Sequence, residues 1–317
     1  MNRPHGDIHD PRLLDFSAPI NPLGAPAGVR EVIARGVELA SRYPTADANE
    51  LCEAAARFHG VARASVLAGN GSSELIYLVA RHFQGRPVRV VTPCFTEYED
   101  ACDASGCPRA SGAEAVATFT ANPTSPAGEL QSHESLLALP GVVVVDEAFL
   151  PFVAGDPSLA STAASTPRLI VLRSLTKLYA IPGLRAGYLV AHPDTVAQLR
   201  KLMPPWSVGS LACAASVRAL ADTEFAELTR ERVAKLRGEL EGGLRALGLD
   251  PAPSVAPYLL VRVPDAGALC TGLRERGIAV RNCDTYTGLE RNRHVRIAVR
   301  ETHDQARLFR AIAELLR

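Results

Sequence analysis

A single lysine stands between two apolar runs in the stretch 171–191, VLRSLTKLYAIPGLRAGYLVA. An ammonium group inside a core is costly unless it is paired or reaches water along its stem. Lys177 follows the hydroxyls of Ser174 and Thr176 and precedes the guanidinium of Arg185. Hydroxyls and a guanidinium suit a phosphate dianion, and a lysine amine with a tuned pKa suits imine chemistry. The stretch therefore predicts an anion site beside a reactive amine.

Two carboxylates end another apolar run, VVVVDEAF at 142–149. Asp146 and Glu147 are expected at the end of a buried strand, where a carboxylate needs a cation or strong hydrogen-bond donors. An aspartate that only caps a helix is the structural alternative. Together with the amine and the anion site, a buried carboxylate points to pyridoxal phosphate as cofactor.

The stretch 66–75, VLAGNGSSEL, has the pattern of a strand, a tight turn and a helix start. Ser72 or Ser73 is the expected N-cap, with Glu74 in the first turn. Free backbone N–H groups at a helix start bind phosphate, although a merely structural turn is the alternative. The stretch approaches G-x-G-x-x-G, but Glu74 stands at the third glycine position and no other feature indicates a dinucleotide.

Alternating strands and helices are predicted around these residues. Short apolar runs at 88–93, 141–148, 168–174 and 186–191 are typical of buried parallel strands, with helical patterns such as 72–83 between them. Ligands of such sheets bind at the carboxyl ends of the strands. Since the candidate motifs fall at these ends, we expect an α/β fold with a mostly parallel sheet.

The chain is expected to divide into an N-terminal arm at 1–30, a large cofactor-binding domain at 31–222 and a smaller α/β domain at 223–317. The arm is rich in proline and glycine, which disfavour regular core elements and favour an extended path. The predicted elements of the last domain are a helix at 223–248, strands at 257–263, 277–282 and 294–300, and a helix at 302–316.

Composition narrows the class of partner. The 317 residues carry 34 basic and 34 acidic side chains, a balance that argues against nucleic acid or an anionic membrane as the main partner. No run of about 18 apolar residues occurs, and the first residues lack the apolar core of a signal peptide. We therefore expect a cytoplasmic protein that acts on a small molecule.

Metal chemistry is not indicated. The seven cysteines are scattered without a C-x-x-C pair, and the eight histidines form no H-E-x-x-H motif. The thiols are interpreted as structural, and no metal site is predicted.

The motifs in chain order resemble a known family. G-N-G-S-S, P-C-F-T-E-Y, N-P-T-S-P, D-E-A-F, S-L-T-K and G-L-R-A-G-Y are similar to the fold-type I, pyridoxal-phosphate-dependent aminotransferases of class I and II, over nearly the whole chain. The stretches 13–26, 204–212, 280–289 and 295–300 resemble the threonine-phosphate decarboxylase branch of cobalamin synthesis. Histidinol-phosphate aminotransferases are the close relatives of that branch.

The resemblance implies roles at the cofactor, pyridoxal 5'-phosphate. Lys177 would hold it as an imine, Asp146 would pair with its pyridine nitrogen, Asn122 would donate to its 3-oxygen and Phe95 would stack on the ring. The residues implied at its phosphate are Gly71, Ser72, Ser174, Arg185 and, from a second subunit of a homodimer, Tyr43. The residues implied at the substrate carboxylate or phosphate are Arg281, Arg296 and His5.

Three functions remain open. The first is decarboxylation of an O-phosphorylated amino acid, most simply L-threonine O-3-phosphate to (R)-1-amino-2-propanol O-2-phosphate. The second is transamination of another amino acid, as in the histidinol-phosphate type, because the bond held perpendicular to the cofactor ring decides the outcome and the same residues serve both. The third is a non-catalytic descendant of the family.

The chain departs from the family pattern in several places. Phe149 replaces a tyrosine common in the aminotransferases, which favours the decarboxylase branch. The segment 98–122 is short, so part of the substrate wall is expected to be missing. H-G-D at 5–7 and N-P-T-S-P-A-G at 122–128 are altered forms of the family motifs, and they allow a different substrate.

Overall fold

The computed structural model describes residue 10 and residues 12–316. Its larger sheet has six strands in the order β2, β7, β6, β5, β4, β3. Their bounds are, in that order, Val66–Gly69, Gly187–Ala191, Leu169–Ser174, Val142–Asp146, Ala117–Ala121 and Val88–Val90. Strands β3 to β6 run parallel to one another, so the mostly parallel α/β sheet predicted from the apolar runs is confirmed.

Strand β7 differs from the prediction that its run is parallel. It pairs antiparallel with both β6 and β2. A parallel return requires a crossover, usually a helix, whereas the residues between β6 and β7 hold only a short 3-10 turn, η3 (Pro182–Leu184). The chain therefore folds straight back, and this connection carries Lys177 and Arg185.

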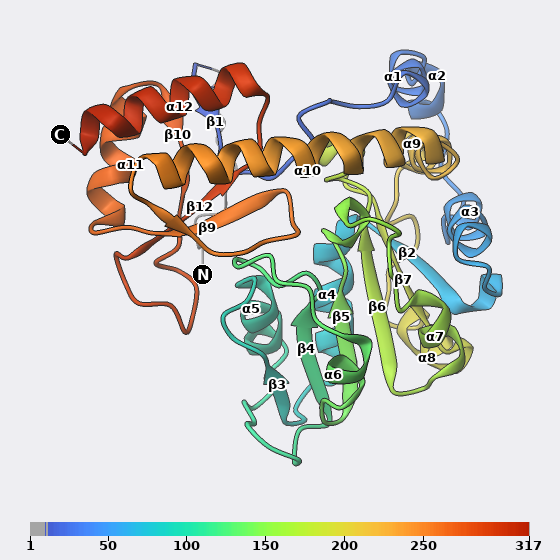
Figure 1. Ribbon diagram of the computed structural model, residues 1–317. Helices are drawn as coiled ribbons and strands as arrows, with labels where there is room; N and C mark the ends of the chain where they lie inside the picture. The colour runs from blue at the N-terminus through green and yellow to red at the C-terminus, as the bar shows by residue number, and fades with distance from the viewer. Residues whose placement is uncertain (1–9, 11, 317) are drawn as a thin grey trace.

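Helices cover both faces of the six-stranded sheet (Figure 1). Because strand side chains alternate between faces, Val144 and Ile170 belong to one core, and Val145 and Val171 to the other. The helices of the first core are α4 (Gly71–His82), α5 (Glu97–Ala104) and α8 (Pro193–Arg200). Those of the second include α1 (Ala27–Ala34), α3 (Asn49–His59), α6 (His133–Leu137), α7 (Ala160–Ser165) and α9 (Ser210–Leu220), and α2 spans Val37–Ala40.

The C-terminal part forms a second, antiparallel sheet in the order β11, β12, β9, β8. Its strands are Arg281–Asn282, His294–Ala298, Tyr258–Arg262 and Asp250–Pro251. Its helices are α10 (Thr223–Ala246), α11 (Ala266–Glu275) and α12 (Thr302–Leu315). The bounds of α10 and α12 are close to those predicted, whereas α11 was not predicted. Figure 1 shows α10 running above both sheets.

The N-terminal segment packs against this second part. Strand β1 (Leu14–Asp15) pairs parallel with β10 (Ile278–Ala279), which lies apart from the four-stranded sheet. The next residue, Phe16, is fully buried in the main core. The segment then continues without regular structure to α1, as its proline and glycine content predicts, while the domain boundaries at 30 and 222 stay a prediction. None of the described helices is both long and apolar enough to span a bilayer.

Candidate active site

A cavity of about 670 Å³ opens where β4, β5 and β6 end. Ala121, Asp146 and Ser174 are the last residues of these strands, and all three line it. Arg281 and Arg296 line it from β11 and β12 of the second sheet. The cavity therefore lies between the two sheets, at the edge where parallel strands place a ligand site.

The Asp146 carboxylate is buried beneath this cavity, with 5% of its surface exposed. Its Oδ2 accepts a hydrogen bond of 2.9 Å from the hydroxyl of Tyr98, and its Oδ1 accepts one of 2.9 Å from the N–H of Ala148. Burial raises the pKa of Asp146 to about 6, although these two donors and the charge of Lys177 act in the opposite direction. A carboxylate in this state favours a cationic partner.

Tyr98 was missed as a site residue by the sequence analysis. It is 2% exposed and lies on α5, one turn after Phe95. The two rings meet edge to face with centroids 5.7 Å apart, and both line the cavity. The signal was its spacing, because i and i+3 positions at a helix start share a face, so a residue three after the expected stacking ring reaches the same wall.

Lys177 lines the cavity just after β6, together with Ser174 and Thr176. The hydroxyls of Ser174 and Thr176 are 2.8 Å apart, and both side chains are buried. Two paired hydroxyls beside a lysine provide hydrogen-bond donors that can turn toward an anion. The geometry thus brings together the amine and the anion-binding groups predicted from the S-L-T-K motif.

The helix start at the cavity differs from the predicted one. Helix α4 begins at Gly71, so Asn70 is the N-cap, and neither Ser72 nor Ser73 caps the helix. Gly71 has φ +81°, which lets the chain turn sharply out of β2 and start the helix two or three residues earlier than predicted. The two serines consequently lie in the first turn, where they line the cavity. Instead of a cap hydroxyl, the Glu74 carboxylate accepts a 2.6 Å bond from the N–H of Asn70.

Arg185 lies against this helix start. A Cβ placed on Gly71 would come within 2.5 Å of Arg185 Nη2, so the glycine leaves the room in which the guanidinium sits. Arg185 donates from Nη1 to the carbonyl of Pro182 at 3.0 Å and lines the cavity. Helix N–H groups, Ser72 and a guanidinium together form a phosphate-sized cradle.

Arg281 and Arg296 form the opposite wall of the cavity and are 7% and 6% exposed. Arg281 donates to the hydroxyl of Thr285 at 3.0 Å. Arg296 donates to the hydroxyls of Tyr286 at 3.1 Å and Ser125 at 3.3 Å. Among the described residues neither arginine forms an ion pair, and the buried Nε of Arg296 has no hydrogen-bond partner. Two buried guanidinium groups with neutral neighbours favour an anion between them.

For three other predicted site residues, Asn122, Tyr43 and His5, the predicted roles stay predictions. Both amide atoms of Asn122 bond the backbone of Gln131, at 2.9 and 3.3 Å, so its contact with a cofactor ring stays a prediction. Tyr43 is 87% exposed and packs beside Trp206, with ring centroids 5.6 Å apart. His5 lies outside the described residues.

The short segment 98–122 still supplies structure to the cavity wall. It holds most of α5 and the whole of β4. The sequence of β4, ATFTA, was not among the predicted apolar runs, although all five of its residues are buried. Between them only an isolated bridge pairs Arg109 with Val88. The loss of substrate wall expected from the length of the segment stays a prediction.

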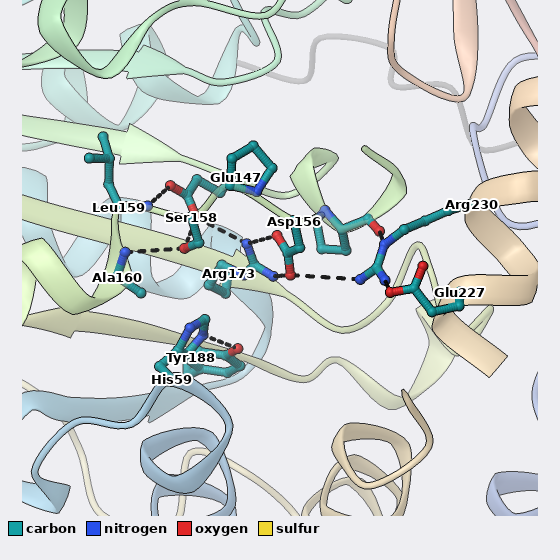
Figure 2. A network of polar contacts seen from close by, with 12 residues as sticks. His59, Glu147, Asp156, Ser158, Leu159, Ala160, Arg173, Tyr188, Glu227 and Arg230 are labelled. Carbon is teal, nitrogen blue, oxygen red and sulfur yellow. Dashed lines mark hydrogen bonds and ion pairs between the residues drawn. The ribbon is translucent and has the colours of Figure 1, made fainter. Parts of the chain in front are cut away.

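Behind the cavity, the other face of β5 and β6 carries a buried ionic network (Figure 2). Glu147 and Arg173 directly neighbour Asp146 and Ser174, but strand alternation turns them to the opposite side. Arg173 is 3.0 Å from Glu147 and 2.6 Å from Asp156, and it is 3% exposed. The two carboxylates at the end of β5 were predicted to need partners. Glu147 pairs with Arg173 on one side of the sheet, whereas Asp146 faces the cavity on the other.

The network reaches α10 through Arg230, whose Nη2 lies 4.0 Å from Asp156 and which also pairs with Glu227. Burial raises the pKa of Glu147, whereas Arg173 holds the pKa of Asp156 below its usual value. A buried pair contributes little net stability but is costly to break from one side. The cluster thus fixes the ends of the two strands that present Asp146 and Ser174.

Comparison with known proteins supplies the family context. The model of the family "Aminotransferase class I and II" matches residues 21–315. The chain is 35% identical to the threonine-phosphate decarboxylase of Salmonella typhimurium, over 98% of this chain and 93% of that protein. It is 36% identical to a histidinol-phosphate aminotransferase of Mycobacterium bovis, over 94% of this chain and 87% of that one.

A solved structure has the same fold. The histidinol-phosphate aminotransferase from Sinorhizobium meliloti, in complex with pyridoxal-5'-phosphate, superposes with a TM-score of 0.87 over 95% of this chain and 90% of that chain, at 21% identity.

Proposed function

This chain belongs to the aminotransferase class I and II family, and from that premise we propose that it decarboxylates L-threonine O-3-phosphate to (R)-1-amino-2-propanol O-2-phosphate, for cobalamin synthesis. It has the fold-type I architecture and uses pyridoxal 5'-phosphate. The choice of a phosphorylated substrate is supported by the 35% identical relative named threonine-phosphate decarboxylase.

The residues of the cavity fit this cofactor. Asp146 is a buried carboxylate whose described donors are a hydroxyl and an N–H, and a protonated pyridine nitrogen would give it a cation. Gly71 leaves space for Arg185 beside the helix start, where a phosphate would bind with Ser72. Lys177 lines the same cavity and would hold the aldehyde carbon. When bound, the cofactor withdraws electrons from the bond that breaks at the substrate Cα.

The observation that carries the proposal is the buried arginine pair on β11 and β12 facing the lysine. A phosphorylated amino acid has two anionic groups, and two guanidinium groups on one wall suit a carboxylate and a phosphate. By fixing both groups, Arg281 and Arg296 would set which bond at Cα lies perpendicular to the ring. The Cα–carboxylate bond would then break, carbon dioxide would leave, and the protonated amine of Lys177 would donate the proton that replaces it on Cα.

The second candidate function is transamination, favoured by the 36% identical histidinol-phosphate aminotransferase. The described cavity supports decarboxylation at one position. Phe149 lines the cavity and packs edge-on against the Tyr258 ring, with centroids 5.0 Å apart. A tyrosine there would add a hydroxyl that can bond the cofactor, whereas phenylalanine contributes only an apolar surface.

We also propose a homodimer in which Tyr43 completes the partner's site. Its support is the 87% exposure of Tyr43 and the 51% exposure of Trp206 packed against it, a large aromatic surface for a single chain to leave open. Sedimentation of the holoenzyme tests this: a dimer is expected, and a monomer that retains all its cofactor would contradict it.

Mass spectrometry of a single incubation tests the function. The holoenzyme is mixed with L-threonine O-3-phosphate, with and without a 2-oxo acid, and carbon dioxide and the phosphorylated products are followed. Carbon dioxide with aminopropanol phosphate in both samples is expected. Amino-group transfer that requires the 2-oxo acid would make the chain an aminotransferase, and no product in either sample would overturn both readings of the substrate. Lys177→Ala is the control and should lose both the visible cofactor absorbance and turnover.

A further inference from the structure

The segment 14–21 connects the two chemical ends of the cavity. Near its middle the carbonyl of Ser17 accepts a 3.2 Å bond from Nη2 of Arg296. At its end the N–H of Asn21 donates to the carbonyl of Lys177 at 3.1 Å. Between them Pro19 lines the cavity. One short stretch of chain thus touches both the anion-binding wall and the main chain of the lysine.

Asn21 fixes the lysine end. Its side chain is 3% exposed, and Nδ2 donates to the carbonyl of Leu178 at 2.7 Å and to the hydroxyl of Thr229 on α10 at 3.0 Å. Its Oδ1 accepts from the N–H of Leu23 at 3.0 Å. A backbone N–H can only donate and a carbonyl can only accept, so these partners permit a single orientation of the amide. Asn21 therefore joins the segment, the lysine loop and α10 at one point.

Arg300 fixes the other end. Its guanidinium donates to the carbonyls of Asp15 at 2.7 Å, Ala18 at 2.8 Å and Ile20 at 2.9 Å. Among the described residues it forms no ion pair, so its described bonds all go to main-chain carbonyls, three of them on this segment. Arg300 follows β12 and lies four residues after Arg296. Three bonds to a six-residue stretch leave that stretch one path, and this path sets where the Ser17 carbonyl meets Arg296.

We propose that Asn21 and Arg300 are positioning residues that, through the segment 14–21, hold the Arg296 guanidinium and the Lys177 loop in a fixed relation. The inference rests on the proposed function for the roles of Lys177 and Arg296. Neither Asn21 nor Arg300 needs to touch the substrate, because each acts through main-chain groups of the segment. A substitution of Asn21 should therefore also affect Arg296, and a substitution of Arg300 should also affect the Lys177 loop.

Two readouts that do not require turnover test the link. The first is the pH titration of the visible absorbance of the lysine-bound cofactor, which reports on Lys177. The second is the shift in melting temperature of the holoenzyme with inorganic phosphate, a probe of the arginine wall that follows mass action. Arg296→Met should abolish the phosphate shift and so validates the probe.

The variants are Arg300→Met and Asn21→Ala. Each is expected to weaken phosphate binding about 10-fold or more, as loss of a hydrogen bond to a charged group does, and to move the midpoint of the absorbance titration. The matched control is Arg237→Met, since Arg237 also donates to carbonyls, those of Val255 and Ala256, away from the segment. Thr229→Val removes only the α10 partner of Asn21 and should titrate as the parent.

Three results would overturn the proposal: an Arg300→Met enzyme that binds phosphate as well as Arg237→Met does, an Asn21→Ala enzyme with the parental titration, or variants that each disturb only their own end. If Asn21→Ala does not fold, Asn21→Ser takes its place. Failure of the proposed function would look different. A wrong role for Lys177 would leave the visible absorbance in Lys177→Ala, and a wrong reaction would appear as amino-group transfer in the parent enzyme, whatever these variants do.

Discussion

Arg281 and Arg296 lie directly opposite each other on the antiparallel strands β11 and β12, and both line the candidate active-site cavity. Like charges facing across two strands destabilise a sheet, so the pair is costly to the empty protein. Their described neighbours are hydroxyls, a carbonyl and aromatic rings, with Arg296 centred 5.0 Å from the Tyr258 ring. An anion bound between them would offset this cost, so this wall of the cavity favours the binding of a negatively charged group.

Replacing either arginine by methionine should therefore separate binding from folding. We expect Arg281→Met and Arg296→Met each to raise KM by at least about 30-fold, since breaking a buried charged contact costs about 2 kcal/mol or more. Cofactor absorbance should not change, and urea unfolding should show that Arg281→Met is no less stable. Arg262→Met, which removes an exposed partner of Glu290, is the control. Equal loss of cofactor and substrate would indicate a structural role instead.

The hydroxyl of Tyr98 should set the acid limit of cofactor binding. Tyr98→Phe removes the donor to Asp146 Oδ2, so the pKa of Asp146 should rise further above about 6. Because an ionised carboxylate is required opposite a pyridinium, cofactor affinity should fall at pH 6 to 7 and recover near pH 8.5. Fluorescence titration of the apo protein across this range measures the shift. An acid limb at the parental pH would contradict the role of the hydroxyl.

Asp146 should also make the apo protein less stable as the pH rises. Its pKa is about 6 when folded and about 3.9 when unfolded, so between these values the folded state binds more protons. Stability is then lost as pH rises from about 4 to 6, by about 3 kcal/mol at most. Asp146→Asn should remove this loss and unfold at higher urea than the parent at pH 7, while binding cofactor poorly. A parallel pH dependence in the two proteins would refute the shift.

His59 should make the fold more stable as the pH rises, which is the opposite of the effect of Asp146. Burial, followed by the nearby charge of Arg173, lowers its pKa to about 3, while its ring lies 2.8 Å from the Tyr188 hydroxyl. Between pH 3 and 6.5 the unfolded state binds the extra proton, so this group stabilises the fold progressively as pH rises through that window. His59→Gln keeps a hydrogen-bonding group and should flatten the acid side of the stability profile. Thermal unfolding from pH 4 to 7 measures it, and an unchanged slope would count against the assignment.

Gly71 should be more sensitive to a methyl group than its backbone conformation alone requires. Alanine would be strained at φ +81° and would also push the Arg185 guanidinium away. Gly60→Ala is the matched control, because Gly60 has φ +65° but nothing within 4 Å of the added Cβ. Both variants should lose about 1 kcal/mol of stability. Only Gly71→Ala is expected to release cofactor at low concentration, as equilibrium dialysis would show, and equal retention in both would leave Arg185 without a role at the phosphate.

Residue order alone was enough to predict most of the fold. The apolar runs that become β5 and β6 are rich in β-branched residues, so their burial and their strand conformation follow from composition. The predicted direction of β7 was wrong because parallel and antiparallel strands can have the same apolar composition. The length and content of the connection decide the direction. Strand β4 was missed because two threonines interrupt its apolar residues, so its sequence ATFTA forms no apolar run. The buried Thr118 is accommodated because its Oγ1 donates to the Pro140 carbonyl at 2.7 Å.

The site was predictable where chemistry stays local in the chain. Ser174, Thr176 and Lys177 lie within four residues, so one strand end presents them together. Tyr98 bonds Asp146 and Asn21 bonds Leu178, across 48 and 157 positions. The spacing from Phe95 could have placed Tyr98 at the cavity wall, but no local pattern indicates either of these two contacts. The helix start was misplaced because serine is a common N-cap, yet glycine flexibility at position 71 moved the start.

The alternation of Asp146 and Glu147 limits how this protein can change over evolutionary time. An insertion or deletion of a single residue inside β5 would turn the strand over, placing Glu147 in the cavity and Asp146 against Arg173. A single such change would therefore disrupt both the cavity and the buried ionic network. We therefore expect β5 to tolerate no change in length, whereas residues of the cavity walls can be exchanged one at a time. New substrates should arise by exchange of wall residues such as Phe149, and never by slippage of the sheet.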